Sequence, residues 1–252
     1  MPTAKALREY YASYYDTAKY RDLGESHVHF SMPQRLARHI LRQVKLQPRP
    51  AVQRLFDFGG GDGTIAIFVG QQILADAYAE RVDITVVDYA APRPVHDARL
   101  SIVGVHEASS LAENDFDIGI ASASLEHVPD LRGCLLRLLK AVRPGGSLYV
   151  RVPYAEPVIR LARFFGLNVD FCYPAHLYDL GEMFWRRVLA TMDLAGSYMI
   201  HSSRPSIVES TLASASFRTI AAHTLKAPWW LIGERYGLVG GWEAVIERGR
   251  SL

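Results

Sequence analysis

The stretch that decides the fold is LFDFGGGDGTIA, residues 55–66, in which an apolar run passes directly into a glycine-rich turn. Four glycines and two aspartates lie between positions 57 and 63. Glycine loses more backbone freedom on folding than any other residue, so such a turn is costly unless another group must approach the backbone closely. A strand that runs through a glycine turn into a helix is typical of nucleotide-binding folds, in which helix N–H groups point at the ligand. The stretch therefore predicts an α/β fold with a ligand against this turn.

Around this turn, short β-type runs alternate with helical stretches from about residue 51 onward. Strands are expected at 52–58, 82–88, 99–106, 116–123, 147–153, 197–203 and 240–248. Helices are expected at 33–46, 63–80, 129–146 and 179–196, the third of them stopped by a Pro-Gly-Gly sequence. Strands that alternate with helices of this length imply a parallel sheet with both faces covered.

Two segments lie outside the alternation. Residues 1–50 are expected to form an N-terminal helical cap; its tyrosines suit either packing against the sheet edge or a lid that excludes water from a site. Residues 51–252 would form the ligand-binding domain, with 204–238 as an insertion that is longer than a hairpin needs. The insertion contains APWWLIGERYGL, an aromatic patch that suits a homodimer contact as well as a lid. The tyrosines of the cap are Tyr10, Tyr11, Tyr14, Tyr15 and Tyr20.

Composition excludes several classes of protein. A net charge of +2 over 252 residues, without a clustered basic surplus, argues against a nucleic-acid partner. No apolar run reaches the roughly 18 residues of a membrane span, and the start lacks the apolar segment of a secretory signal. Cys134 and Cys172 lack metal-ligand spacing, which favours two reduced thiols. We therefore expect a cytoplasmic protein without membrane contact.

Asp57 and Thr64 argue against a dinucleotide-binding motif. The G-x-G-x-x-G/A pattern counted from Gly59 would need Gly or Ala at position 64, where the chain has threonine. An ionised Asp57 buried under the turn would cost several kcal/mol unless it faced a cation or ordered the N–H groups of the turn. Asp88 ends the next strand, a position from which a carboxylate accepts hydrogen bonds from the ribose hydroxyls of an adenosine group.

With these motifs, residues 51–200 resemble the class I S-adenosylmethionine-dependent methyltransferases, especially a small-molecule subgroup found with sugar and polysaccharide biosynthesis. The matching stretches are DFGGGDG (57–63), ITVVDYA (84–90), FDIGIASASLEHVPD (116–130), LLKAVRPGGSLYVRVP (138–153) and HLYDLGEMFWRRVLATMDLAG (176–196). The resemblance implies a Rossmann-like, seven-stranded, mostly parallel sheet whose last strand is antiparallel, with helices on both faces. It also implies S-adenosylmethionine as the cofactor.

The resemblance assigns roles to the matching residues. Gly59, Gly61 and Gly63 would line the methionine end of the cofactor. Asp57 would meet its amino group through water or backbone, and Asp88 would hold the ribose. Three further expected cofactor contacts are Glu107, near the adenine amine, and Ser122 and Ser124, which follow the fourth strand. Asp62 is expected to be an acid at a helix N-terminus, stabilised by the helix dipole.

Transfer of a methyl group from a sulfonium to a hydroxyl needs positioning, exclusion of water and a base near the hydroxyl proton. Histidine suits that role, and His127 and His176 are the candidates. Each has an alternative role in local structure, His127 as a turn residue and His176 as a residue that orients the following helix. No sequence cluster of acids and histidines indicates a metal, so no metal site is expected.

The preferred hypothesis is therefore a small-molecule methyltransferase, acting on the oxygen of a sugar, glycolipid or related metabolite. Two alternatives stay open at this stage. One is a non-catalytic subunit that keeps the methyltransferase fold, and the other is a nicotinamide-dependent oxidoreductase, against which Asp57 and Thr64 argue. Binding of S-adenosylmethionine and turnover of an acceptor distinguish the three.

Overall fold

The computed structural model describes residues 32–46, 51–154, 156–167, 176–206, 224, 226–229, 231–233, 236 and 238–250. Three predicted features lie outside these residues: the tyrosine-rich part of the cap, Cys172 and most of the insertion. The domain boundary at residue 50, the lid and the dimer contact therefore stay predictions. No helix in the described parts of the chain has both the length and the apolar character needed to cross a membrane.

Strands and helices alternate along the chain, as the sequence predicts. The strands are β1 (Val52–Phe58), β2 (Arg81–Val87), β3 (Leu100–Val105), β4 (Phe116–Ser122), β5 (Val142–Tyr154), β6 (Tyr198–Pro205) and β7 (Gly240–Arg248). The helices are α3 (Pro33–Gln43), α4 (Thr64–Ala75), α5 (Leu131–Ala141), α6 (Glu156–Phe164) and α7 (Glu182–Thr191). Two short 3₁₀ turns, η1 (Ala108–Ser110) and η2 (Leu125–His127), follow β3 and β4.

The strands form one seven-stranded sheet in the order β3-β2-β1-β4-β5-β7-β6. β7 runs antiparallel to both of its neighbours, β5 and β6, and the pairs among β1 to β5 are parallel. This confirms the predicted mostly parallel, Rossmann-like sheet with an antiparallel last strand. β1 lies between β2 and β4, so the chain reverses its direction of travel across the sheet there. Ligands of open α/β sheets bind at the carboxyl ends of strands at such a reversal.

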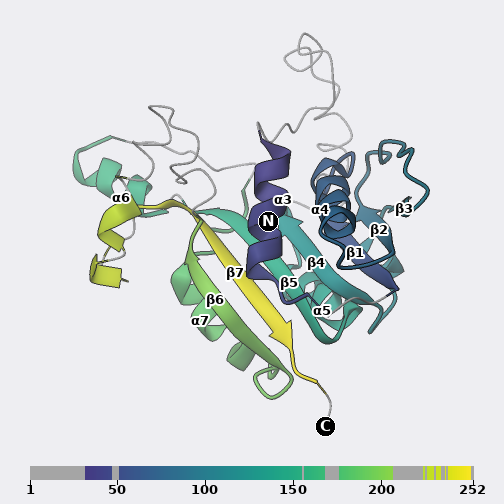
Figure 1. The fold of residues 1–252 in the computed structure, drawn as a ribbon. Coiled ribbons are helices and arrows are strands. Elements are labelled where there is room, and N and C mark those ends of the chain that lie inside the picture. The colour runs from purple at the N-terminus through teal and green to yellow at the C-terminus, as the bar shows by residue number, and fades with distance from the viewer. Residues whose placement is uncertain are drawn as a thin grey trace.

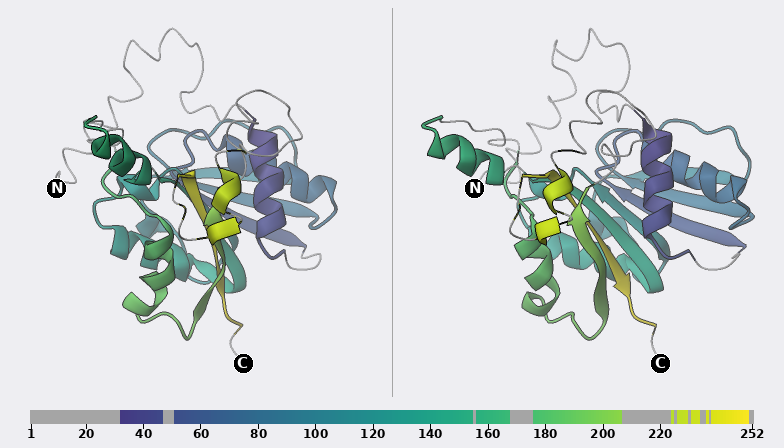
Figure 2. Two further views of the ribbon diagram at one scale, coloured as in Figure 1. Left: turned by 90° about the vertical axis from the view of Figure 1, so that its left-hand side faces the viewer. Right: turned by 60° about the vertical axis from the view of Figure 1, so that its left-hand side comes forward.

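Helices cover both faces of the sheet (Figures 1 and 2), and each face has its own apolar core. α3 and α4 pack on one face, where Leu36, Ile40 and Ile73 are fully buried. α5 and α7 pack on the other face, where Leu135 and Trp185 are fully buried. The core thus fixes the two helical layers and leaves the carboxyl ends of β1, β2 and β4 at one edge.

All four predicted helices extend beyond their observed ends. The helices expected at 33–46, 63–80 and 179–196 end at Gln43, Ala75 and Thr191. The error with the largest structural consequence is in the third helix. The helix expected at 129–146 ends at Ala141, and the Pro-Gly-Gly sequence lies inside β5 instead of in a loop. Val142 already pairs with Phe116 of β4, and the register shifts before Ser147 pairs with Ile118. Gly146 allows this close approach, because a Cβ there would lie 2.7 Å from the carbonyl oxygen of Asp117. Strand pairing therefore begins earlier than the local sequence indicates.

Candidate functional site

The glycine turn between β1 and α4 has the backbone that its sequence predicts. Gly59, Gly61 and Gly63 have φ angles of +69°, +58° and +79°, a region that L side chains rarely adopt. The N–H of Gly59 donates to the carbonyl of Val87 (2.9 Å), which ties the turn to the end of β2. A Cβ on Gly61 would meet no atom within 4 Å, so the turn is open on that side. The three glycines thus form a backbone cradle that a ligand can approach.

Asp57 lies directly beneath this cradle. Its side chain packs so close to Gly60 that a Cβ there would lie 2.5 Å from Asp57 Cγ. Asp57 is 2% exposed, and no hydrogen bond reaches its Oδ2 in the described structure. Burial raises the pKa of Asp57 to about 7, and the nearby charge of Asp88 adds to the shift. A buried carboxylate with one oxygen that lacks a hydrogen bond fits a cationic group of a ligand, such as the amino group expected here.

Asp88 follows β2 and reaches the same cradle. Its Oδ2 accepts a hydrogen bond from the N–H of Gly61 (2.8 Å), and its Oδ1 accepts one from the N–H of Ala90 (3.0 Å). Each carboxylate oxygen can accept further hydrogen bonds, so Asp88 keeps capacity for ligand hydroxyls. The structure therefore brings the acid of the second strand and the glycine turn together at one edge of the sheet.

The end of β4 forms the third side of the cradle. Ser124 packs so closely on Gly59 that a Cβ there would lie 2.4 Å from the Cβ of Ser124. The Oγ of Ser124 is buried and has no hydrogen-bond partner in the described structure. Between Ser124 and the strand-end residue Ser122, Ala123 has a φ of +57°, which costs a non-glycine residue about 1–2 kcal/mol. Strained backbone of this kind gathers at functional sites.

Glu107 lies outside this set of contacts. It is exposed, precedes η1 and accepts a hydrogen bond from Ser109 Oγ (3.1 Å). Its contact with an adenine amine stays a prediction. Asp62 lies two residues before α4. Its Oδ1 accepts from the N–H of Thr64 (3.0 Å), and it also pairs with Arg93 (2.6 Å).

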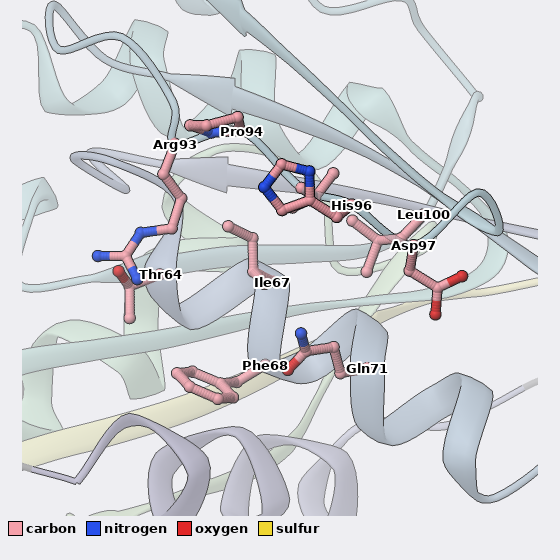
Figure 3. A pocket seen from close by; sticks show the side chains of 10 residues that line it. Thr64, Ile67, Phe68, Gln71, Arg93, Pro94, His96, Asp97 and Leu100 are labelled. Atoms are coloured by element: carbon pink, nitrogen blue, oxygen red, sulfur yellow. The ribbon is translucent and has the colours of Figure 1, made fainter.

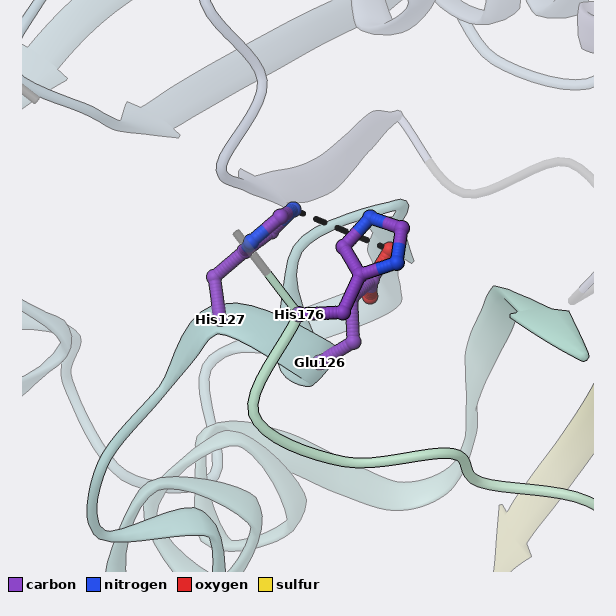
Figure 4. Close-up of side chains that lie close together, drawn as sticks. All are labelled: Glu126, His127 and His176. Carbon is purple, nitrogen blue, oxygen red and sulfur yellow. Dashed lines mark ion pairs between the residues drawn. The ribbon is translucent and has the colours of Figure 1, made fainter. Parts of the chain in front are cut away.

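The two candidate histidines meet at a buried glutamate (Figure 4). Glu126 and His127 belong to η2, and the N–H of Leu177 donates to the carbonyl of Glu126 (2.7 Å), which holds His176 beside them. The His127 and His176 rings lie 4.9 Å apart between centroids. The Nε2 of His127 lies 3.9 Å from Oε1 of Glu126. Two residues of η2 and one from far along the chain thus form one cluster, which we call the EHH cluster: Glu126, His127 and His176.

Burial controls the protonation of this cluster. It raises the pKa of the Glu126 carboxyl to about 7, partly opposed by the positive charge of Arg151. Burial also lowers the pKa of His176, so that its imidazole is neutral at pH 7. Neither carboxylate oxygen of Glu126 nor Nδ1 of His176 has a hydrogen-bond partner among the described residues.

The sequence analysis did not single out Glu126. Glu126 directly precedes the candidate His127 in the segment after β4, and this position was the available signal. An acid in such a loop is normally exposed, so the sequence did not indicate its burial. Glu126 is fully buried, and it follows Ser124 by two residues. Two Cα–Cα steps of 3.8 Å place its Cα at most about 7.6 Å from that of Ser124. The backbone of the EHH cluster therefore begins next to the cradle, and the N–H of His127 donates to the carbonyl of Ser124 (3.2 Å).

A separate pocket of about 320 Å³ lies between α4 and the connection from β2 to β3 (Figure 3). It is lined by Thr64, Ile67, Phe68, Gln71, Arg93, Pro94, Val95, His96, Asp97 and Leu100. None of these side chains is a predicted cofactor or catalytic residue. The pocket therefore does not coincide with the cradle, which is defined by backbone and buried polar groups.

Comparison with known proteins supports the class that this geometry indicates. The methyltransferase domain family matches residues 28–191, which is more than half of the chain. A curated relative, the ubiquinone/menaquinone biosynthesis C-methyltransferase UbiE of Dinoroseobacter shibae, is 36% identical over 111 residues. That alignment spans 42% of this chain and 44% of the relative.

Two solved structures show the same fold at low identity. Phosphoethanolamine N-methyltransferase 2 of Haemonchus contortus, in complex with phosphomonomethylethanolamine and S-adenosylhomocysteine, has a TM-score of 0.53 and 14% identity, covering 100% of this chain and 61% of that one. Loganic acid methyltransferase with S-adenosylhomocysteine has a TM-score of 0.51 and 10% identity, covering 87% and 92%.

Three features fit the cofactor of that family, S-adenosylmethionine: Oδ2 of Asp57 without a hydrogen bond, the open side of Gly61 and the buried Oγ of Ser124 without a partner in the described structure. The match to a methyltransferase family also argues against the alternative of a nicotinamide-dependent oxidoreductase. The chain belongs to the methyltransferase domain family, with the fold and cofactor of the class I S-adenosylmethionine-dependent methyltransferases.

Proposed function

We propose that this protein methylates a hydroxyl oxygen of a small-molecule acceptor, in the class of sugars, glycolipids and related metabolites. The observation that carries the proposal is the EHH cluster, a set of proton-accepting groups beside the cofactor cradle. The bound cofactor supplies an electrophilic methyl group on a sulfonium. A hydroxyl acceptor must lose its proton as it attacks the methyl group. Apart from that, displacement at the sulfonium needs mainly alignment of the two reactants and exclusion of water.

In this proposal the cradle residues bind and orient the cofactor. The glycine turn lies against its methionine part, Asp57 pairs with the ammonium group, and Asp88 accepts hydrogen bonds from the ribose. Ser122 and Ser124 contact the methionine end from the β4 side, and Glu107 meets the adenine amine. The support for the first two assignments is the geometry of the turn and the buried Oδ2 of Asp57, which lacks a hydrogen bond in the described structure.

His176 is the proposed base. Its imidazole is neutral because burial lowers its pKa, and Nδ1 has no hydrogen-bond partner among the described residues, so a nitrogen lone pair can accept the hydroxyl proton. The Glu126 carboxyl then stabilises the imidazolium that forms, which is the role an acid beside a catalytic histidine plays in general. His127, whose ring lies beside that of His176, is the second candidate for the same proton.

Carbon methylation is a second candidate function, favoured by the relative named as a C-methyltransferase. An aromatic carbon beside a phenol becomes nucleophilic when the phenol loses its proton, so the same base serves both reactions. A small-molecule acceptor with an acidic hydroxyl would thus be methylated at oxygen or at the neighbouring carbon.

The experiment is a screen of the purified full chain for release of S-adenosylhomocysteine with sugar nucleotides, glycolipids and phenols as acceptors. Mass spectrometry of the product, before and after hydrolysis, identifies a methyl ether or a methylated carbon. An ether product confirms the proposal, and a methylated carbon supports the second candidate. Tight cofactor binding without methylation of an acceptor from any of these classes would favour the non-catalytic subunit instead.

A further inference from the structure

We infer that Glu126, His127 and His176 form a binding site for one divalent first-row transition-metal ion, with Zn²⁺ as the probe. The binding site follows from the side chains alone. The role we give to the ion rests on the proposed hydroxyl methylation.

The donor set suits such an ion. Each of the three residues offers one ligand atom, and these atoms all lie within 4.8 Å of one another. In a tetrahedral site with bonds of about 2.1 Å, the ligand atoms are about 3.4 Å apart. The ligand atoms here would therefore have to approach one another by at most about 1.4 Å, which side-chain rotation can supply. Two imidazoles with one carboxylate favour zinc, iron, cobalt or manganese over calcium and magnesium, which prefer oxygen ligands. Within the described ranges no other three His, Cys, Asp or Glu side chains converge in this way.

The burial of Glu126 is the second, independent observation. Its side chain is 1% exposed, and neither carboxylate oxygen accepts a hydrogen bond in the described structure. The positive charge of Arg151 lowers the pKa of this carboxyl. The Nε of Arg151 donates a hydrogen bond to Oγ of Ser206 (3.1 Å). A buried polar group that lacks hydrogen bonds is costly, and a coordinated cation removes that cost. Nδ1 of His176 is buried without a partner as well.

The backbone holds the three ligands in place without the ion. Consecutive residues of η2 supply Glu126 and His127, and the N–H of His127 donates to the carbonyl of Ser124 (3.2 Å). His176 is fixed by the hydrogen bond between Leu177 and the carbonyl of Glu126. The hydroxyl of Tyr178 donates to the carbonyl of Pro129 (2.7 Å) and anchors the same segment. Such preorganisation reduces the cost of ordering ligands when an ion binds.

Three protein ligands leave a coordination position for a substrate oxygen, the arrangement of catalytic rather than structural zinc. An acceptor hydroxyl bound there would lose its proton to solvent more readily. Its oxygen would then form the new C–O bond as the S–CH₃ bond breaks, with that electron pair left on the sulfur of S-adenosylhomocysteine. In the metal-bound protein the histidines act as ligands, and the ion takes over the activation of the hydroxyl from His176.

The test is calorimetric titration of the chelator-treated full chain with ZnCl₂, with absorption of Co²⁺ as a second readout. We expect one ion per chain, with affinity at least about 100-fold lower in Glu126→Gln and His176→Ala, since even the loss of outer contacts costs 10–100-fold. His201→Ala is the matched control, because His201 lies 3.5 Å from Glu247 in a more exposed His–Glu pair. It should bind Zn²⁺ like the unaltered chain.

Circular dichroism verifies that each variant is folded, and the isosteric Glu126→Gln keeps the test valid if His176→Ala unfolds. The absence of saturable binding, or binding that neither variant weakens, would overturn the metal site. Chelator-treated protein that still methylates a hydroxyl at the full rate would remove the ion from the reaction while leaving the proposed function intact. Zinc-bound protein that methylates no hydroxyl acceptor would instead count against the proposed function.

Discussion

The carboxylate of Asp88 accepts a hydrogen bond from the backbone N–H of Gly61 at 2.8 Å, so the end of β2 and the glycine turn of β1 form a single unit. The residue assigned to the ribose thus also fixes the turn that faces the methionine part. Asp88→Ala should weaken S-adenosylhomocysteine binding by about 2–4 kcal/mol, through lost hydrogen bonds to ribose and a looser turn. Calorimetry measures this, with Asp97→Ala, at a half-buried acid that pairs with Arg99, as the control that should bind normally. An unchanged dissociation constant for Asp88→Ala would refute the placement of the ribose.

Gly61 and Gly233 provide a matched pair for the cradle. Their φ angles are +58° and +57°, and a Cβ on either would meet nothing within 4 Å. Alanine should therefore lower the free energy of unfolding by about 1–2 kcal/mol at both positions, through backbone strain alone. Gly61→Ala should in addition reduce cofactor affinity at least about tenfold, because its methyl group occupies the side that the ligand approaches. Equal cofactor affinity in the two folded variants would contradict the cradle.

Asp57 should make cofactor binding depend on pH. Burial raises its pKa to about 7, so the free protein binds a proton that its unfolded chain releases near pH 4. The stability that this proton contributes therefore falls as pH rises from about 4 to 7. Pairing with the cofactor ammonium selects the carboxylate, so affinity should increase by up to about tenfold per pH unit on approaching pH 7.

Asp57→Asn keeps the shape and removes the charge. We expect weaker cofactor binding that no longer increases with pH between about 5.5 and 7, measured by titration at each pH. A pH profile identical to that of the unaltered chain would assign the dependence to another group, such as Glu126, whose pKa burial also raises to about 7.

Glu243 of β7 joins α3 to the sheet. Its Oε2 lies 2.7 Å from Nε2 of His39 and accepts from the hydroxyl of Tyr149 (3.0 Å), and its Oε1 accepts from Nε of Arg204 (3.0 Å). Glu243→Gln should lower the free energy of unfolding by about 1.5–3 kcal/mol, because it removes the charge that strengthens the hydrogen bonds to the partly buried His39 and Arg204. Glu113→Gln, at an exposed pair, should cost less than about 1 kcal/mol. Chemical denaturation of both variants measures the difference.

The same network gives stability a dependence on acid pH. Burial raises the pKa of Glu243, but the hydrogen bonds from His39 and Arg204 outweigh it and hold the pKa below its ordinary value of 4.5. This contribution to stability is complete above about pH 4.5 and is lost as pH falls through the lowered folded value. Glu243→Gln should therefore show a shallower loss of stability below pH 4.5 than the unaltered chain.

His176→Ala should reduce kcat about a hundredfold or more once an acceptor is known, with a small change in the dissociation constant of the cofactor. His201→Ala, which removes an exposed imidazole, should leave both constants unchanged. A change confined to KM for the acceptor would make His176 a residue that positions the acceptor. Stopped assays with saturating cofactor distinguish the two outcomes.

Much of the cradle could be predicted from the sequence because its parts are local. The turn needs positive φ angles that the glycines at 59, 61 and 63 adopt readily, and the alternation of strands with helices placed Asp88 at a strand end. Boundaries were less accurate where long-range pairing competes with local signals. Pro-Gly-Gly reads as a helix stop, yet pairing of Val142 with β4 makes it part of β5.

The sequence by itself determined the α/β class, the glycine turn and the acid that follows the second strand, because each depends on the periodicity and backbone freedom of neighbouring residues. Only the tertiary structure decided that Ser124 packs against Gly59 and that His176 joins Glu126 and His127. Those contacts depend on the order of strands in the sheet and on one backbone hydrogen bond across a long separation in the chain. The burial of Glu126 likewise depends on how the whole fold packs, because solvent exposure is a property of the packed structure. Its sequence context alone is that of an ordinary loop acid.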